Sequence, residues 1–324
     1  MPSTIDLQQD LPVVDQVNEV MPSFSTKQLS GTPKRSLVDA VRTACLETGF
    51  FCLELDARQR AVVDRTIGSM RQFFAIDDDD QVKRRVVSRT GGYGWIPRYS
   101  EPAYQPGTVS KLEAFEFGVE NLAEIGFWPD SPDFAATATA CWQEYLAIAN
   151  SALTVLALAA GLDAGFLIRN CNSRELNTMR LLHYAAEHDR IHERSVGIAA
   201  HTDFECMTLL YQTEPGLELF DARGRWVDVP VNNGRLIVML DDMLERWTNG
   251  CFRATGHRVR DTDRQRFSIV MFVAANSDVT IAPLDEFVSA SHPARYGPVT
   301  QEDHIEAEVR RARENAERLA ATAS

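Results

Sequence analysis

The chain is poor in positive charge, and lysine is rare in it. Among its 324 residues, 33 are Lys or Arg and 46 are Asp or Glu, which gives a formal net charge of −13. The lysines are Lys27, Lys34, Lys83 and Lys111. This balance excludes a protein that holds nucleic acid or an anionic membrane through bulk positive charge. Hydrophobic residues make up 44% of the chain, so a wholly disordered chain is excluded as well.

The chain also has few of the features of a secreted or membrane protein. Its six cysteines form no Cys-x-x-Cys pair, and they favour reduced, mostly buried thiols in a cytoplasmic protein. The N-terminal residues show neither a basic start nor the apolar run of a signal peptide, so we expect no secretion. The uncharged run 145–162 is diluted by Asn150, Ser151 and Thr154. A buried core helix is therefore favoured over a membrane span.

Helical spacing dominates the first half of the chain. Leu37, Val41 and Ala44 share one face of a predicted helix, and Gly49 can end it. Gly161 can likewise end a long helix with an apolar face. The predicted helices are 36–48, 58–74, 134–160 and, at the C-terminus, 301–321, with a short strand over 50–55.

Short β-rich runs alternate with turns between residues 177 and about 276. Breakers such as Glu214-Pro215-Gly216 separate them. The predicted strands are 208–212, 217–220, 226–229, 236–240 and 267–274. This spacing predicts an antiparallel barrel or jelly roll. With no convincing linker, we expect one domain over 1–324, made of a helical region (about 1–165), a jelly-roll core (177–276) and a C-terminal segment with a helix (277–324).

Three potential metal ligands lie in the β-rich half. In His201-Thr202-Asp203, the outer two residues would share one face of a strand, and His257 would come from another strand. Two imidazoles and one carboxylate leave coordination positions open, which suits non-haem Fe(II). A buried polar cluster without metal is the alternative. We expect His201, Asp203 and His257 to form a catalytic iron site.

Arg266 and Ser268 form a second candidate pair nine and eleven residues after His257. On a strand they would share a face. A guanidinium binds a carboxylate through two parallel hydrogen bonds, and a hydroxyl adds a third. The pair therefore predicts an anchor for the distal carboxylate of a 2-keto diacid, with a structural salt bridge as the alternative.

The order of these motifs resembles the isopenicillin N synthase-like family of Fe(II)/2-oxoglutarate-dependent oxygenases. The matching stretches are LPVVD (11–15), ACLETGFFCLEL (44–55), GGYGW (91–95), KLEAFEFG (111–118), MRLLHY (179–184), HTDFECMTLLYQTEPGLELF (201–220), GRWVDVP (224–230), DDMLERWTNGCFRATGHRV (241–259) and RQRFSIVMF (264–272). The resemblance implies an α+β protein with a mainly β core. That core would be a double-stranded β-helix, a cupin-like jelly roll, with an N-terminal helical cap and a C-terminal helix.

The family pattern also implies roles for single residues. His201, Asp203 and His257 match its iron ligands, and Arg266 and Ser268 match its co-substrate anchor, which Tyr184 supports. The substrate candidates are Arg89, Tyr93 and Arg180, although Arg180 could equally pair with a carboxylate of the core. Three residues depart from the pattern and put the pocket shape and the role of Tyr184 in question: Leu182, Ala185 and Glu205, the last in place of a usual glycine.

The resemblance implies an oxidoreductase that uses Fe(II), 2-oxoglutarate and O2. It would hydroxylate a small-molecule metabolite, as in secondary metabolism, and release succinate and CO2. Desaturation and ring closure are open to the same chemistry. Arginines near residues 89–98 favour a carboxylate-bearing substrate, and we expect neither nucleic acid nor membrane as a partner. Two alternatives remain at this point: an isopenicillin N synthase-type oxidase that uses O2 without 2-oxoglutarate, and a non-catalytic binding protein on the same fold.

Overall fold

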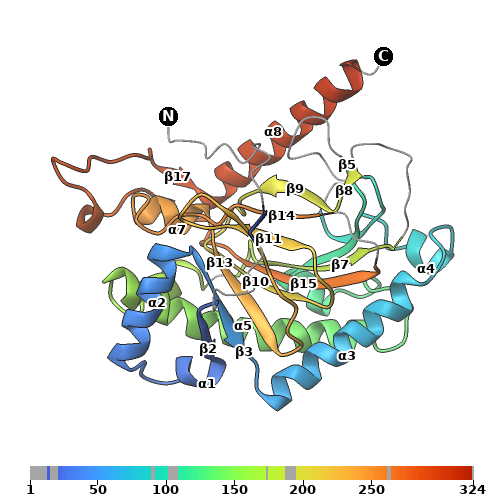
Figure 1. Ribbon diagram of the computed structural model, residues 1–324. Coiled ribbons are helices and arrows are strands. Elements are labelled where there is room, and N and C mark those ends of the chain that lie inside the picture. Colours follow the sequence, from blue (N-terminus) through green and yellow to red (C-terminus); the bar gives the residue numbers. More distant parts are fainter. Residues whose placement is uncertain are drawn as a thin grey trace.

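Two facing β-sheets form the centre of the molecule, and helices cover the outside (Figure 1). The computed structural model describes residues 13–14, 21–88, 92–100, 109–172, 174–186, 195–260 and 264–322. Among these, no helix combines the length and the apolar character that crossing a bilayer requires. Residues 145–160 of the uncharged run lie in a helix of the core, as predicted.

The larger sheet has eight strands in the order β2-β3-β13-β10-β15-β7-β6-β4. Four of them come from the predicted jelly-roll region, and four come from the helical region before it. Its strands are β2 (Ser23–Ser25), β3 (Phe50–Glu54), β4 (Gly94–Ile96), β6 (Glu113–Gly118), β7 (Thr178–Tyr184), β10 (Met207–Gln212), β13 (Arg235–Leu240) and β15 (Arg266–Val273). The first half of the chain therefore extends the jelly roll as well as covering it.

The smaller sheet has five strands in the order β1-β12-β11-β14-β9. These are β1 (Val13–Val14), β9 (Ile198–His201), β11 (Leu217–Phe220), β12 (Trp226–Asp228) and β14 (His257–Val259). Two further pairs are short: β5 (Val109–Ser110) with β8 (Ser195–Val196), and β16 (Thr280–Ile281) with β17 (Val299–Thr300). The predicted jelly roll is confirmed, since strands of the 177–276 region supply half of the larger sheet and four of the five strands of the smaller one, paired antiparallel.

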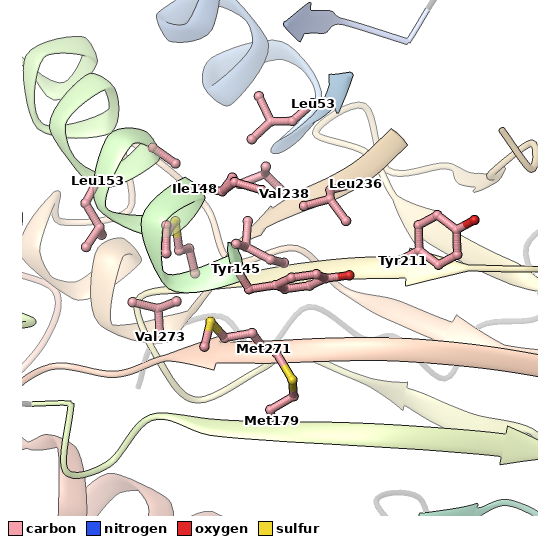
Figure 2. Packing of buried hydrophobic residues seen from close by; sticks show 14 of the residues in the cluster. Leu53, Tyr145, Ile148, Leu153, Met179, Tyr211, Leu236, Val238, Met271 and Val273 are labelled. Carbon is pink, nitrogen blue, oxygen red and sulfur yellow. The ribbon is translucent and has the colours of Figure 1, made fainter. Parts of the chain in front are cut away.

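Helices cover the outer face of the larger sheet. The long helix α5 (Phe134–Ala160) packs its alanine-rich face against that sheet, where Tyr145 and Ile148 meet Val238 and Met271 (Figure 2). Gly161 ends it with φ of 84°, a left-handed conformation that glycine adopts without strain. The other helices are α1 (Thr26–Leu29), α2 (Arg35–Glu47), α3 (Ala57–Phe74), α4 (Gln81–Arg84), α6 (Phe166–Asn170), α7 (Asp242–Trp247) and α8 (Gln301–Thr322), with short 3-10 turns at Val119–Ala123 and Asp285–Phe287.

A second cluster of apolar side chains lies between the two sheets. Leu210 and Val270 of the larger sheet meet Ile198, Leu217 and Val259 of the smaller one. Because side chains alternate along a strand, each strand of the larger sheet supplies one set to the helices and the other set to this interior. The interior set includes the residues of the candidate site.

A buried ionic network fixes the outer strands of the larger sheet. Glu113 of β6 accepts hydrogen bonds from the Trp95 indole at 2.8 Å and from the Lys83 ammonium at 3.0 Å. Its other oxygen lies 2.8 Å from Nδ1 of His183. The side chains of Glu113 and Lys83 are fully buried. Burial raises the pKa of Glu113, but His183 and Lys83 lower it more, so the pKa lies below its ordinary value.

We expect Glu113→Ala to destabilise the protein by up to about 3–5 kcal/mol, because it removes the buried partner of Lys83 and leaves this ammonium with the half-exposed Asp78 carboxylate at 2.8 Å. Since the folded-state pKa of Glu113 is lowered, its stabilising effect is complete above the pKa of the unfolded chain and is lost as pH falls through the folded value. Urea unfolding from neutral to acid pH measures both effects. The double variant Lys83→Met/Glu113→Gln should recover part of the loss. If Glu113→Ala unfolds at the same urea concentration as the wild type, the network does not stabilise the fold.

Candidate metal centre and its cavity

His201, Asp203 and His257 converge on one point at the edge of the smaller sheet. His201 is the last residue of β9, and it pairs across the sheet with His257, the first residue of β14. The two imidazole centroids lie 4.2 Å apart. Oδ1 of Asp203 lies 3.5 Å from Nε2 of His201 and 3.6 Å from Nε2 of His257. One ligand atom from each residue lies within 4.8 Å of the others, a spacing that one metal ion can bridge.

The prediction that His201 and Asp203 share a strand is wrong. β9 ends at His201, and Asp203 lies in the loop that leads to β10. The strand ends there because the chain leaves the smaller sheet to join the larger one. Contacts to the start of α7 hold the loop, including a hydrogen bond from the Asp242 amide to the Asp203 carbonyl at 3.1 Å. Cys206, which follows the loop, is buried with its sulfur 3.4 Å from that of Cys171.

Backbone carbonyls orient both imidazoles. Nδ1 of His201 lies 2.8 Å from the Ala199 carbonyl, and Nδ1 of His257 lies 3.1 Å from the Thr255 carbonyl. A carbonyl can only accept, so each Nδ1 carries the hydrogen and each Nε2 keeps a lone pair toward Asp203. Burial lowers the pKa of His257 to about 4, which keeps this imidazole neutral.

The third candidate ligand, Asp203, is an ionised carboxylate. Burial raises the pKa of Asp203, but His257, His201 and the Thr208 hydroxyl lower it more, to about 2. Two neutral nitrogens and one carboxylate oxygen are the donor set that suits ferrous iron with open positions. The residues present therefore fit this metal.

Sequence reasoning missed Thr208 and Asp241, which support Asp203. The Thr208 hydroxyl donates to Oδ2 of Asp203 at 2.6 Å and also lies 3.0 Å from Oδ2 of Asp241. All three side chains are buried. The signal in the sequence is weak, because a threonine five residues after an aspartate has no distinctive spacing and Asp241 is far along the chain.

We expect Thr208→Val to weaken ferrous-ion affinity about 10- to 100-fold, the usual cost of removing a group that orients a metal ligand. Valine keeps the shape of threonine, so the change removes the hydrogen bond with little repacking. Calorimetric titration of the metal-free protein with Fe(II) under anaerobic conditions measures the effect. Thr213→Val, outside the site, is the matched control. Unchanged affinity in Thr208→Val would show that Asp203 needs no such support.

Arg266 and Ser268 lie on the interior face of β15, as predicted, and both are fully buried. The Arg266 guanidinium donates from Nη2 to Gln212 Oε1 at 2.9 Å and from Nε to the Glu214 carbonyl at 3.2 Å. It stacks on Tyr184, with 4.7 Å between the guanidinium carbon and the ring centroid. Within the described residues, Arg266 Nη1 and the Ser268 hydroxyl are buried without a hydrogen-bond partner. Two unsatisfied donors on one face fit an absent carboxylate.

A cavity of about 580 Å³ is lined by His201, Asp203 and His257. Tyr184 and Leu182 line it as well, and they place it beside Arg266, which stacks on Tyr184, and Ser268, which pairs with Leu182 across the strands. The opposite end is bounded by Phe272 and by the apolar face of α8, through Ile305 and Val309. Small-molecule sites usually enclose about 300–1,000 Å³, so the volume fits a co-substrate together with a small substrate.

The predicted substrate contacts lie in different places. Arg180 of β7 lines the cavity, which is consistent with a substrate contact. Its Nε also lies 3.1 Å from a Glu116 carboxylate oxygen, which is consistent with pairing to a carboxylate of the core. Tyr93 points toward Glu120 and Gly118, and the described cavity lining does not include it. Arg89 lies outside the described residues. Glu205, seen in the sequence only as a departure from a pattern, lines the cavity beside Asp203.

Two family models match the chain. The model described as the 2OG-Fe(II) oxygenase superfamily matches residues 176–275, and that of the non-haem dioxygenase N-terminal region matches residues 21–132. A 2-oxoglutarate-dependent dioxygenase of Monascus ruber (citB) is 31% identical over 78% of this chain and 82% of its own. A 2-oxoglutarate-Fe(II) type oxidoreductase of Emericella nidulans (hxnY) is 28% identical over 91% of this chain and 89% of its own.

Solved structures share the fold. A full-length protein of Neurospora crassa, solved in complex with alpha-KG, has a TM-score of 0.76 at 22% identity and covers 94% of this chain and 99% of its own. The rice dioxygenase for auxin oxidation has a TM-score of 0.71 at 24% identity, with 93% of this chain and 99% of its own covered. The predicted double-stranded β-helix is thereby confirmed.

Proposed function

Because the chain belongs to the 2OG-Fe(II) oxygenase superfamily, we propose that His201, Asp203 and His257 bind its ferrous ion. We also propose that Arg266 and Ser268, with Tyr184 beside them, bind the distal carboxylate of 2-oxoglutarate. The observation that carries this proposal is the pair of unsatisfied donors, Arg266 Nη1 and Ser268 Oγ, buried on one face of β15. A binding protein without catalysis would need neither these donors nor an open metal site.

Ferrous iron, 2-oxoglutarate and O2 together supply the oxidation of a substrate C–H bond, coupled to decarboxylation of 2-oxoglutarate to succinate and CO2. The protein positions the substrate and excludes water from the site. The apolar residues Leu182, Leu210 and Val270 line the cavity near the anchor, and Ile305 and Val309 of α8 bound its other end. Hydroxylation is the reaction that we propose, with desaturation or ring closure as variants that substrate geometry selects.

We propose that the substrate is a small molecule that carries a carboxylate. Arg180 supports this, because it lines the cavity on the same strand as Tyr184, four residues from it toward the opposite end. Burial lowers the pKa of Arg180 only to about 10, so the guanidinium stays charged at neutral pH. Its ion pair with Glu116 fixes its position. Arg89 and Tyr93 remain candidate substrate contacts.

The whole chain would act as one domain, since strands β2, β3, β4 and β6 complete the larger sheet. Six free cysteines, five of them buried, favour a reducing cytoplasmic compartment.

The decisive experiment counts succinate and CO2 formed for each substrate molecule oxidised. We expect the three quantities to be equal. Anaerobic addition of Fe(II) and then 2-oxoglutarate should also produce a metal-to-ligand charge-transfer band without any substrate. Substrate oxidation with no 2-oxoglutarate consumed would contradict the proposal and would indicate an isopenicillin N synthase-type oxidase.

A further inference from the structure

We propose that Glu205 binds a basic nitrogen of the substrate, so that the enzyme acts on amines or amino acids. The inference rests on the proposed function of the same site and deepens it by naming a substrate class. It depends on the position of one carboxylate, which the family resemblance does not supply.

Glu205 is a buried acid that faces the cavity. It is 8% exposed and lines the cavity two residues after the metal ligand Asp203. Oε2 accepts a hydrogen bond from the Phe204 amide at 3.0 Å. No ion pair joins Glu205 to a cationic side chain in the part of the chain that the structure describes, which distinguishes it from the acids Glu113, Glu116 and Glu218.

The arginines near Glu205 form their ion pairs and hydrogen bonds with other groups of the described chain. Arg180 lies in the same cavity, close enough for the charge of Glu205 to act on its pKa, but its ion pair is with Glu116. Arg266 belongs to the anchor on β15 and is hydrogen-bonded to Gln212 and Glu214. A carboxylate that is removed from water needs a cation or several donors to offset the cost. A ligand that brings a cationic N–H group into the cavity would meet this need.

The rest of the cavity near Glu205 favours an apolar body on such a ligand. Phe204 and Phe272 lie there, and Ile305 and Val309 face it from α8. Glu116 adds a second carboxylate, and Arg180 adds the guanidinium proposed for a substrate carboxylate. An amino acid with an apolar side chain would satisfy Glu205 and Arg180 together, and a simple amine would satisfy Glu205 alone.

The test uses matched trios of ligands on phenyl, indolyl and alkyl skeletons: an amine, the amino acid and the carboxylate without the amine. 2-Phenylethylamine, phenylalanine and 3-phenylpropionate form one trio. Each is titrated anaerobically into the Fe(II)·2-oxoglutarate enzyme, and binding is followed by calorimetry and by perturbation of the charge-transfer band. The variants are Glu205→Gln, which removes the charge at nearly constant shape, and Glu205→Asp, which keeps it.

In the wild type we expect amines and amino acids of at least one skeleton to bind at up to millimolar concentration. Glu205→Gln should weaken their binding about 10- to 100-fold, the range of a hydrogen bond to a charged group, while the carboxylate is unaffected or binds better. Glu205→Asp should retain part of the preference. Asp242→Asn is the matched control, because Asp242 is a nearby acid that pairs with His304 and is absent from the cavity lining.

Three results would overturn the inference: no amine binds to the wild type, amines bind equally well to Glu205→Gln, or Asp242→Asn causes the same loss. Thermal unfolding of each variant shows whether it is folded. Failure of the proposed function looks different, because the wild type would then give no charge-transfer band with Fe(II) and 2-oxoglutarate. Calorimetry with the amines would still test Glu205 in that case.

Discussion

Replacing His257 with alanine is expected to abolish turnover and to weaken ferrous-ion binding by more than about 100-fold, beyond the loss for a supporting group. His257 begins β14 and offers its Nε2 at 3.6 Å from the Asp203 carboxylate. Without His257, His201 and Asp203 are the two proposed ligands that remain. Two ligands bind ferrous ion much more weakly than three. Anaerobic titration with Fe(II) measures the affinity, and substrate-independent decarboxylation of 2-oxoglutarate measures the activity.

The matched control is His292→Ala. His292 is exposed, and its ring nitrogen lies 3.2 Å from the Asn249 carbonyl, away from the cavity lining. We expect this variant to bind iron and to react as the wild type does. Circular dichroism should show that His257→Ala is folded, because the hydrogen bond of its imidazole within the described chain is the one to the Thr255 carbonyl, and its other neighbours are the His201 ring and Asp203 of the same site. Iron binding at wild-type affinity in folded His257→Ala would contradict the proposed ligand set.

Local patterns in the sequence predicted the long helices and six of the strands, but not β4 and β6 of the larger sheet. The helix predicted over 134–160 is α5, with the same bounds, because its apolar residues recur at helical spacing and Gly161 stops it. The strand predicted over 217–220 is β11. The other predicted strands differ by one residue at one end from β10, β12 and β13, and by one residue at each end from β15.

The arrangement of the site was less accessible to sequence reasoning, because it depends on contacts between distant segments. The family motif identified His201, Asp203 and His257, but it could not show that β9 stops before Asp203. The Thr208–Asp241 contact joins β10 to the residue between β13 and α7 across 33 residues of chain, and the Arg180–Glu116 ion pair follows from strand register. The periodicity of a sequence shows on which face of a strand a residue lies. The register between two strands decides which residue of the neighbouring strand lies opposite it.

The role of Glu205 illustrates the same limit. In the sequence, Glu205 was only a departure from a usual glycine. Whether its carboxylate could bind a substrate depended on whether a cationic side chain paired with it. The structure gives it a place in the cavity lining and assigns the nearby arginines to other partners. A pattern of residues along one segment carries no information about such charge pairing.

Arg266→Ala is expected to raise the dissociation constant of 2-oxoglutarate from about 30-fold to several thousand-fold, the effect of losing about 2–5 kcal/mol from a buried charge pair. Arg266 is fully buried, and Gln212, Glu214 and Tyr184 fix its guanidinium while Nη1 keeps no described partner. A carboxylate is the group that would use this donor. Anaerobic titration of the Fe(II) protein with 2-oxoglutarate, read from the charge-transfer band, measures the constant.

Arg264→Ala is the control, since its side chain is 72% exposed and lies two residues away on the same segment. Arg266→Lys keeps the charge without the planar fork, so we expect an intermediate loss. Wild-type affinity in Arg266→Ala would contradict the anchor.

Ser268→Ala tests whether the proposed carboxylate anchor serves 2-oxoglutarate binding or the stability of the fold. Its hydroxyl is buried and bonds to no described residue, so its removal should leave the melting temperature unchanged or higher. In the same variant, 2-oxoglutarate should bind about tenfold more weakly, because one hydrogen bond to its charged carboxylate is lost. A lower melting temperature with unchanged 2-oxoglutarate affinity would instead assign Ser268 to the packing of the core.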